Sequence, residues 1–166
     1  MLTYRRSDSL QIIGYADANF AGDNEKSTSG YVFLLAGAIS WKSCKQIFTT
    51  SSIMYAEFVA YYKATGQVNW LKKFIPGLRV VDDISRPLKL YCDNEPAVMY
   101  AHNNKSSGAA KHIDIKFYVV KDKVRDQIIS LEHISTVKIL ADPLTKGLPP
   151  YVLVEHVAGT GLKERL

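Results

Sequence analysis

The sequence is poor in cysteine and in long hydrophobic runs. It has two cysteines, Cys44 and Cys92. No apolar run approaches the roughly 20 residues that a membrane-spanning helix needs, and no signal-peptide pattern opens the chain. Both cysteines lie in apolar, strand-like segments, so we expect reduced, buried thiols and no disulfide. These absences predict an intracellular, cytoplasmic protein without a membrane partner.

Internal repeats, low-complexity tracts and several common catalytic patterns are also missing. The sequence has no P-loop, no Ser-His-Asp order and no Cys/His spacing typical of zinc sites. These absences argue against a P-loop nucleotide hydrolase, a serine hydrolase and a zinc enzyme. A length of 166 residues suits one domain with a sizeable core. The four histidines are scattered and form no ligand cluster: His102, His112, His133 and His156.

Positive charge is concentrated in one part of the chain. The net charge is +5, and six lysines or arginines lie between residues 102 and 125 against two acids, Asp114 and Asp122. A basic face of this kind suits a polyanion such as a nucleic acid. A solvated helix face has the same composition, so charge alone leaves both interpretations open.

Hydrophobic patterning predicts strands and helices in a definite order. Cap candidates Ser51 and Ser52 start a long helix that Pro76-Gly77 ends, and residues 19–29 are expected to be a loop. The expected strands are 10–17, 30–35, 38–43, 87–93 and 127–134, and the further helices are 95–102, 111–125 and 141–146.

This order predicts an α/β fold with a mixed five-stranded sheet flanked by helices. The first three strands can form an antiparallel meander, while helical crossovers place the fourth and fifth parallel to the first. Ligands in such sheets collect beyond the carboxyl ends of the parallel strands. Asp17 and Asp93 fall at those expected ends, so the topology alone brings two acids together.

Two further carboxylates accompany this pair at the ends of apolar runs. Glu57 lies on the apolar stripe of the long helix, at i+4 from Ile53, where a glutamate needs a better partner than the helix dipole. Asp142, followed by Pro143, fits either an N-cap or a metal ligand. Carboxylates are expensive to bury without a cation. If the four converge, they form an oxygen site suited to Mg or Mn, which in pairs assist phosphoryl displacement.

The chain resembles the ribonuclease H domain of copia-type LTR retrotransposon Pol polyproteins. The resemblance covers residues 10–148 in the family's order, and the ordered set of motifs is highly specific. It includes residues 15–23, 27–31 and 39–43, Lys45-Gln46, Ser51-Ser52, Ala56-Glu57-Phe58, Cys92-Asp93-Asn94, residues 111–115 and residues 141–146.

The resemblance implies a ribonuclease H-like fold and a metal-dependent endoribonuclease. Such an enzyme hydrolyses the RNA strand of RNA/DNA hybrids during reverse transcription, with two Mg²⁺ ions for which Mn²⁺ can substitute. The implied catalytic and metal-binding residues are Asp17, Glu57, Asp93 and Asp142. The implied nucleic-acid contacts are Ser51, Ser52, Asn94, Lys111 and His112, and reading 2′-hydroxyls would distinguish RNA from DNA.

The sequence also departs from the wider family. Many relatives carry a histidine on a loop before the last aspartate, and residues 135–141 contain none. A catalytically weak, nucleic-acid-binding remnant of a retroelement is therefore an alternative, as is another nuclease on the same fold. We expect residues 1–9 to be a tether to a reverse transcriptase domain and residues 149–166 to be a tail that can be helical. The isolated domain is expected to be a monomer.

Overall fold

The computed structural model describes residues 10–21, 25–78, 87–103 and 111–161, and of residues 111–114 it describes the backbone alone. The expected tether, residues 1–9, and the side chains of Lys111 and His112 therefore lie outside the described residues.

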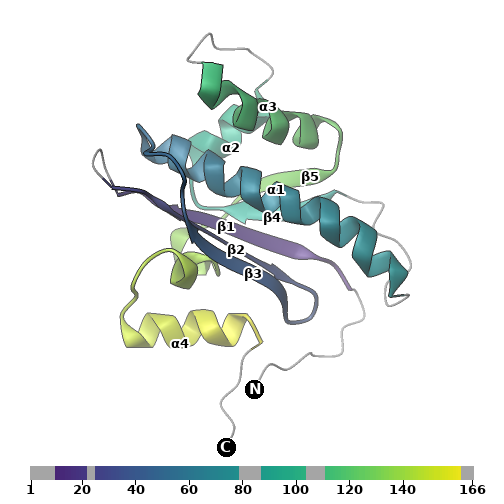
Figure 1. Cartoon of the computed structure of the whole chain (residues 1–166). Coiled ribbons are helices and arrows are strands. Elements are labelled where there is room, and N and C mark those ends of the chain that lie inside the picture. The colour runs from purple at the N-terminus through teal and green to yellow at the C-terminus, as the bar shows by residue number, and fades with distance from the viewer. Residues whose placement is uncertain (1–9, 22–24, 79–86, 104–110, 162–166) are drawn as a thin grey trace, which may run out of the picture.

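Five strands form one mixed sheet with the order β3-β2-β1-β4-β5 (Figure 1). The first three strands are antiparallel neighbours, and β4 and β5 run parallel to β1. This arrangement confirms the predicted fold class. The strand bounds are Ile13–Asn19 for β1, Thr28–Leu34 for β2, Ala38–Lys45 for β3, Leu88–Cys92 for β4 and Ile129–His133 for β5.

The first strand differs from its prediction at both ends. It begins three residues later than expected and continues two residues beyond Asp17, so Asp17 lies inside the strand and not at its end. Antiparallel pairing of Asn19 with Thr28 extends both strands into a segment predicted as a loop. The polar composition of this segment predicts a loop, but hydrogen bonds between the two strands outweigh that local preference.

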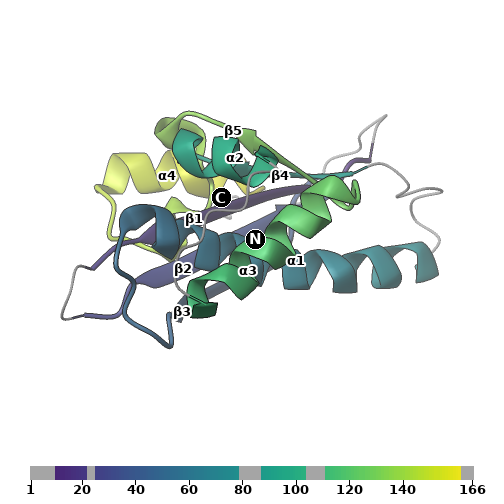
Figure 2. The ribbon, with the colours of Figure 1, turned by 90° about the horizontal axis from the view of Figure 1, so that it is seen from above.

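Three helices cover one face of the sheet, and α1 and α3 lie side by side there (Figures 1 and 2). Ser52 is the N-cap of the long helix, and its hydroxyl accepts a hydrogen bond from the Tyr55 backbone N–H at 3.1 Å. The helix ends as predicted, with Pro76 in its last turn. The bounds are Ile53–Gly77 for α1, Glu95–His102 for α2 and Lys111–Arg125 for α3.

The opposite face carries two short 3-10 turns, η1 (Thr136–Lys138) and η2 (Asp142–Leu144), and the helix α4 (Pro150–Gly159). The predicted helix over 141–146 is thus only a single 3-10 turn. Pro143 fixes the backbone φ of one residue of this turn, directly after Asp142.

The core lies between α1, α3 and the sheet. The rings of Phe58 and Phe117 are 4.1 Å apart between centroids, and Phe33 and Leu90 are fully buried beneath them. Cys92 is a buried free thiol as predicted, but Cys44 is only half-buried, and its sulfur accepts a hydrogen bond from the Lys63 ammonium at 3.1 Å. Among the described helices, none is both long and apolar enough to cross a bilayer.

Candidate active site

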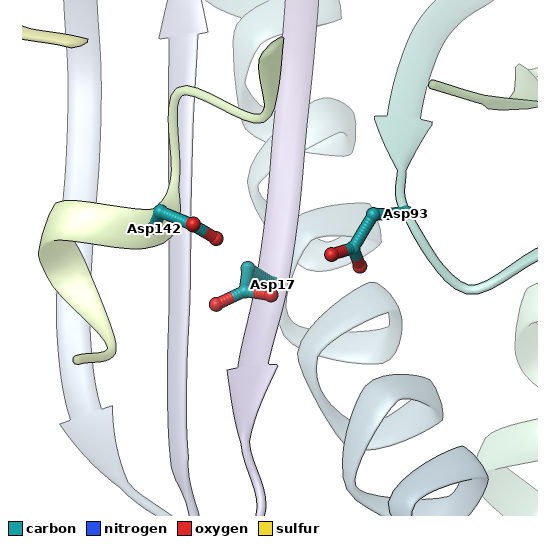
Figure 3. Close-up of side chains that lie close together, drawn as sticks. All are labelled: Asp17, Asp93 and Asp142. Carbon is teal, nitrogen blue, oxygen red and sulfur yellow. The ribbon is translucent and has the colours of Figure 1, made fainter. Parts of the chain in front are cut away.

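Three aspartates from three separate segments meet at one place (Figure 3). Asp17 comes from β1, Asp93 directly follows β4, and Asp142 opens η2. Each contributes a carboxylate oxygen, and the three oxygens lie within 4.8 Å of one another. Asp17 and Asp142 are buried, whereas Asp93 is half-buried. Such spacing places three negative charges around a volume that fits a divalent cation.

A glycine makes this convergence possible. Gly30 pairs with Asp17 across β1 and β2, and η2 packs directly upon it. A Cβ atom added to Gly30 would lie 2.7 Å from Cγ2 of Thr145 and 2.8 Å from Cβ of Leu144. A side chain at this position would lift the turn from the sheet, and Asp142 with it.

Asp142 is held by its own turn and by a lysine. Its Oδ1 lies 3.0 Å from the Lys146 ammonium, and its backbone oxygen accepts a hydrogen bond from the Thr145 hydroxyl. The N-cap position of η2 belongs to Ala141, and no side chain caps the turn. The Asp142 side chain therefore has no capping role here and is directed toward the other acids (Figure 3).

The protein surroundings make ionisation of Asp17 costly. Burial, with a smaller contribution from the neighbouring charges of Asp142 and Asp93, raises its pKa to about 6. A hydrogen bond from the Thr145 hydroxyl to Oδ2 and the charge of Lys146 act in the opposite direction. In the metal-free protein Asp17 therefore takes up a proton near pH 6, well above the ordinary range of an aspartate.

Glu57 lies beside this group without belonging to the closely spaced triad. It is 3% exposed, as its place on the apolar stripe predicts. Burial and then the charges of Asp17 and Asp93 raise its pKa well above the ordinary value, while the Tyr61 hydroxyl and the Ala18 backbone N–H lower it. Its Oε2 has no hydrogen-bond partner among the described residues. A weak interaction with the helix dipole does not account for a glutamate buried so deeply.

The donor chemistry of these four acids fits Mg²⁺ or Mn²⁺. All are hard oxygen donors, and the buried Oε2 of Glu57 accepts no hydrogen bond from the described residues. Lys146 supplies one positive charge against up to four negative ones, and the acids raise its pKa, which burial by itself would lower. A divalent cation would supply the charge that remains uncompensated.

The structure places the expected nucleic-acid contacts in different ways. Ser51 and Ser52 are exposed at the start of α1, and Asn94 is half-buried, immediately after Asp93. Asn94 is the N-cap of α2, where its side chain accepts a hydrogen bond from the Ala97 backbone N–H at 2.9 Å. The other two expected contacts are Lys111 and His112, and their side chains lie outside the described residues.

Sequence reasoning missed three residues of the site: Thr145, Lys146 and His156. The first two lie three and four residues after Asp142, a spacing that brings side chains together on a helical turn and was a usable signal. His156 belongs to α4, is 3% exposed, and its charge acts on Asp142. No sequence signal linked this helix to the acids. His133, the histidine nearest to the missing loop position, is exposed.

Retrotransposon proteins match most of this sequence. The chain is 35% identical over 139 residues to the "Retrovirus-related Pol polyprotein from transposon TNT 1-94" of Nicotiana tabacum, which covers 82% of the chain. It is 31% identical over 147 residues to that from transposon RE1 of Arabidopsis thaliana, covering 87%. The chain spans 10% of the length of each relative. No protein-family model matches the sequence.

Two solved structures of nucleic-acid complexes share the fold. LC11-RNase H1 in complex with an RNA/DNA hybrid superposes with a TM-score of 0.59 at 16% identity, over 81% of this chain and 94% of that one. The foamy viral protease-reverse transcriptase in complex with RNA/DNA hybrid gives 0.53 at 17% identity, over 87% of this chain and 21% of that one.

Proposed function

The chain is an RNase H-like domain homologous to a segment of copia-type retrotransposon Pol polyproteins, and we propose that it hydrolyses the RNA strand of RNA/DNA hybrids. The observation that carries this proposal is the convergence of Asp17, Asp93 and Asp142 within 4.8 Å on an RNase H-like sheet. A binding remnant would have no need to keep three mutually repelling acids so close together.

In this proposal Asp17, Glu57, Asp93 and Asp142 hold two Mg²⁺ ions, for which Mn²⁺ can substitute. Paired divalent ions supply a lowered pKa for an attacking water and charge stabilisation for the leaving 3′ oxygen. The Thr145 hydroxyl keeps the Asp17 carboxylate in one orientation. Because Asp17 takes up a proton near pH 6, metal binding has to compete with that proton, and we expect activity to fall as the pH drops through this value.

The hybrid would lie over the place where these acids meet. Ser51 and Ser52 are exposed at the start of α1, the helix that carries Glu57, and Asn94 follows Asp93 directly. Hydroxyl and amide groups can hydrogen-bond to the 2′-hydroxyls of RNA, which gives a physical basis for sparing DNA duplexes. Because the relatives are about ten times longer, we propose a reverse transcriptase domain as the partner in a parent polyprotein.

The test is cleavage of an end-labelled RNA/DNA hybrid by the purified domain, with Mg²⁺, with Mn²⁺ and with chelator. We expect metal-dependent loss of the RNA strand and no cleavage of a DNA duplex. Asp93→Asn should lower the rate at least a hundredfold while circular dichroism shows an unchanged fold, because it removes one carboxylate of the triad. Glu155→Gln removes an exposed acid on α4 and should leave the rate unchanged.

The alternative is a remnant that binds nucleic acid without turnover. The absence of a histidine from residues 135–141 favours this alternative. Salt-dependent binding of the hybrid by a folded protein, with no cleavage at any metal concentration, would replace the nuclease proposal by this one. Full activity of Asp93→Asn would show that the acid triad is not the active site.

A further inference from the structure

A buried glutamine connects α1, which carries Glu57, with β2, the strand that pairs with the Asp17 strand. Gln46 follows β3 directly and is 1% exposed. Its side-chain amide Nε2 donates one hydrogen bond to the Ser29 hydroxyl at 2.8 Å and a second to the Ala56 backbone oxygen at 2.9 Å. Its backbone N–H bonds to the Ser27 backbone oxygen at 2.8 Å, so the main chain at this residue is held as well.

One partner of this amide, Ala56, is next to Glu57 in the chain, and the other, Ser29, lies opposite the residue after Asp17. Ser29 pairs with Ala18 across β1 and β2, and Ala18 directly follows Asp17. Ala56 directly precedes Glu57, whose carboxyl group interacts with the backbone N–H of Ala18. Two hydrogen bonds, the pairing of β1 with β2, the interaction of Glu57 with the Ala18 N–H and the peptide bond between Ala56 and Glu57 thus close a ring of five residues.

We propose that Gln46 is a positioning residue that fixes the Glu57 carboxylate relative to Asp17. This inference rests on the proposed function, in which both acids hold metal. A glutamine suits the position because a single NH₂ group can donate to two acceptors at once. The Ala56 carbonyl accepts only, which sets the orientation of the amide and excludes a glutamate of the same shape. Residues that orient ligands in this way commonly contribute 10- to 100-fold to metal affinity.

The first measurement is made on metal-free protein. Gln46→Met keeps the approximate volume of the side chain and removes both donors. We expect the Ala18 amide to exchange with deuterium about tenfold faster in this variant, relative to the Leu131 amide in β5. A merely structural loss would raise both exchange rates together. Equal protection of Ala18 in the parent and in Gln46→Met would overturn the proposal.

The second measurement is Mn²⁺ affinity by calorimetry, which needs no turnover. We expect Gln46→Met to weaken binding by about tenfold or more. If Gln46 acts through Glu57, this loss disappears in a Glu57→Gln background, because the group it positions is already gone. Losses that simply multiply in the double variant would show that Gln46 acts on the site in another way.

Thr50→Val is the matched control. Thr50 is 1% exposed and its hydroxyl bonds to that of Ser27 at 2.8 Å, so the substitution breaks a buried hydrogen bond of the same connection without touching the ring. It should leave Mn²⁺ affinity and Ala18 protection unchanged. If Gln46→Met does not fold, Ser29→Ala removes one acceptor of the same amide and is expected to act in the same direction.

The outcomes separate this inference from the proposed function. If Glu57→Gln weakens Mn²⁺ binding and Gln46→Met does not, the metal site stands and the role of Gln46 is refuted. If Glu57→Gln leaves Mn²⁺ affinity unchanged, the proposed ligand set is wrong, and the metal-positioning role of Gln46 is refuted with it.

Discussion

Neutralising Asp17 should stabilise the metal-free protein. Its pKa is raised from the ordinary value of 3.8 to about 6, chiefly by burial. This difference corresponds to a cost of about 3 kcal/mol for the ionised form in the folded state. In Asp17→Asn the Thr145 hydroxyl can still donate, to the amide oxygen, whereas the attraction to Lys146 is lost. We therefore expect a gain of about 1–3 kcal/mol in the free energy of unfolding at about pH 8.

The gain should depend on pH in a defined direction. A carboxyl group whose folded pKa is raised binds its proton more tightly in the folded state than in the unfolded state. The parent protein therefore loses this part of its stability as the pH rises from about 4 through about 6, and the loss is complete above that range. At about pH 5 the advantage of Asp17→Asn should shrink to about half, and near pH 3 it should vanish.

The assay is urea unfolding in chelator across this pH range, with Glu155→Gln as the exposed-acid control. Saturating Mg²⁺ should stabilise the parent by binding its folded state, and it should not stabilise Asp17→Asn. A variant that is less stable than the parent at about pH 8, or a difference that does not change with pH, would refute the electrostatic reasoning.

Two further substitutions and one control test the contacts that hold the acids in place. Gly30→Ala should weaken Mn²⁺ binding at least tenfold in calorimetry and cost about 1–3 kcal/mol in urea unfolding, since its Cβ would lie 2.7 Å from Thr145. Gly66→Ala in α1, where a Cβ meets nothing within 4 Å, should instead stabilise by up to about 1 kcal/mol. Lys146→Gln should lower the free energy of unfolding measured in chelator, because it removes the ion pair with Asp142. It should also tighten Mn²⁺ binding, because the ammonium no longer competes with the metal for the Asp142 carboxylate. Weaker Mn²⁺ binding would contradict this competition.

Strand topology predicted more of this molecule than local composition did. The crossover argument correctly placed β4 and β5 parallel to β1, and so predicted that Asp17 and Asp93 lie close together. The ends of β1 and β2 were wrong because polar residues favour a loop locally, while pairing between Asn19 and Thr28 depends on the tertiary fold. Propensity is a weak guide wherever cross-strand bonds decide the outcome.

The third aspartate shows where sequence reasoning reaches its limit. Local pattern left Asp142 equally suited to an N-cap and to a metal site, and family resemblance alone favoured the latter. Its position depends on η2 packing onto a glycine of a distant strand, which no periodicity reveals. Lys146 pairs with Asp142 within the same turn and could have been found from its spacing, whereas the contact of Thr145 with Asp17 exists only once that turn has docked.

The acid cluster has to be held together by the residues around it. Among the ion pairs of the described residues, one involves the cluster, between Lys146 and Asp142, so the metal-free fold carries uncompensated repulsion. Left unsupported, the acids would move apart or draw in water. Three features oppose that movement: Gly30, which lets η2 pack on β2, the Thr145 hydroxyl, which bonds to Asp17, and the side-chain amide of Gln46. A fold that holds like charges together at a cost in stability suits a cation, because a bound cation would relieve the repulsion between the carboxylates.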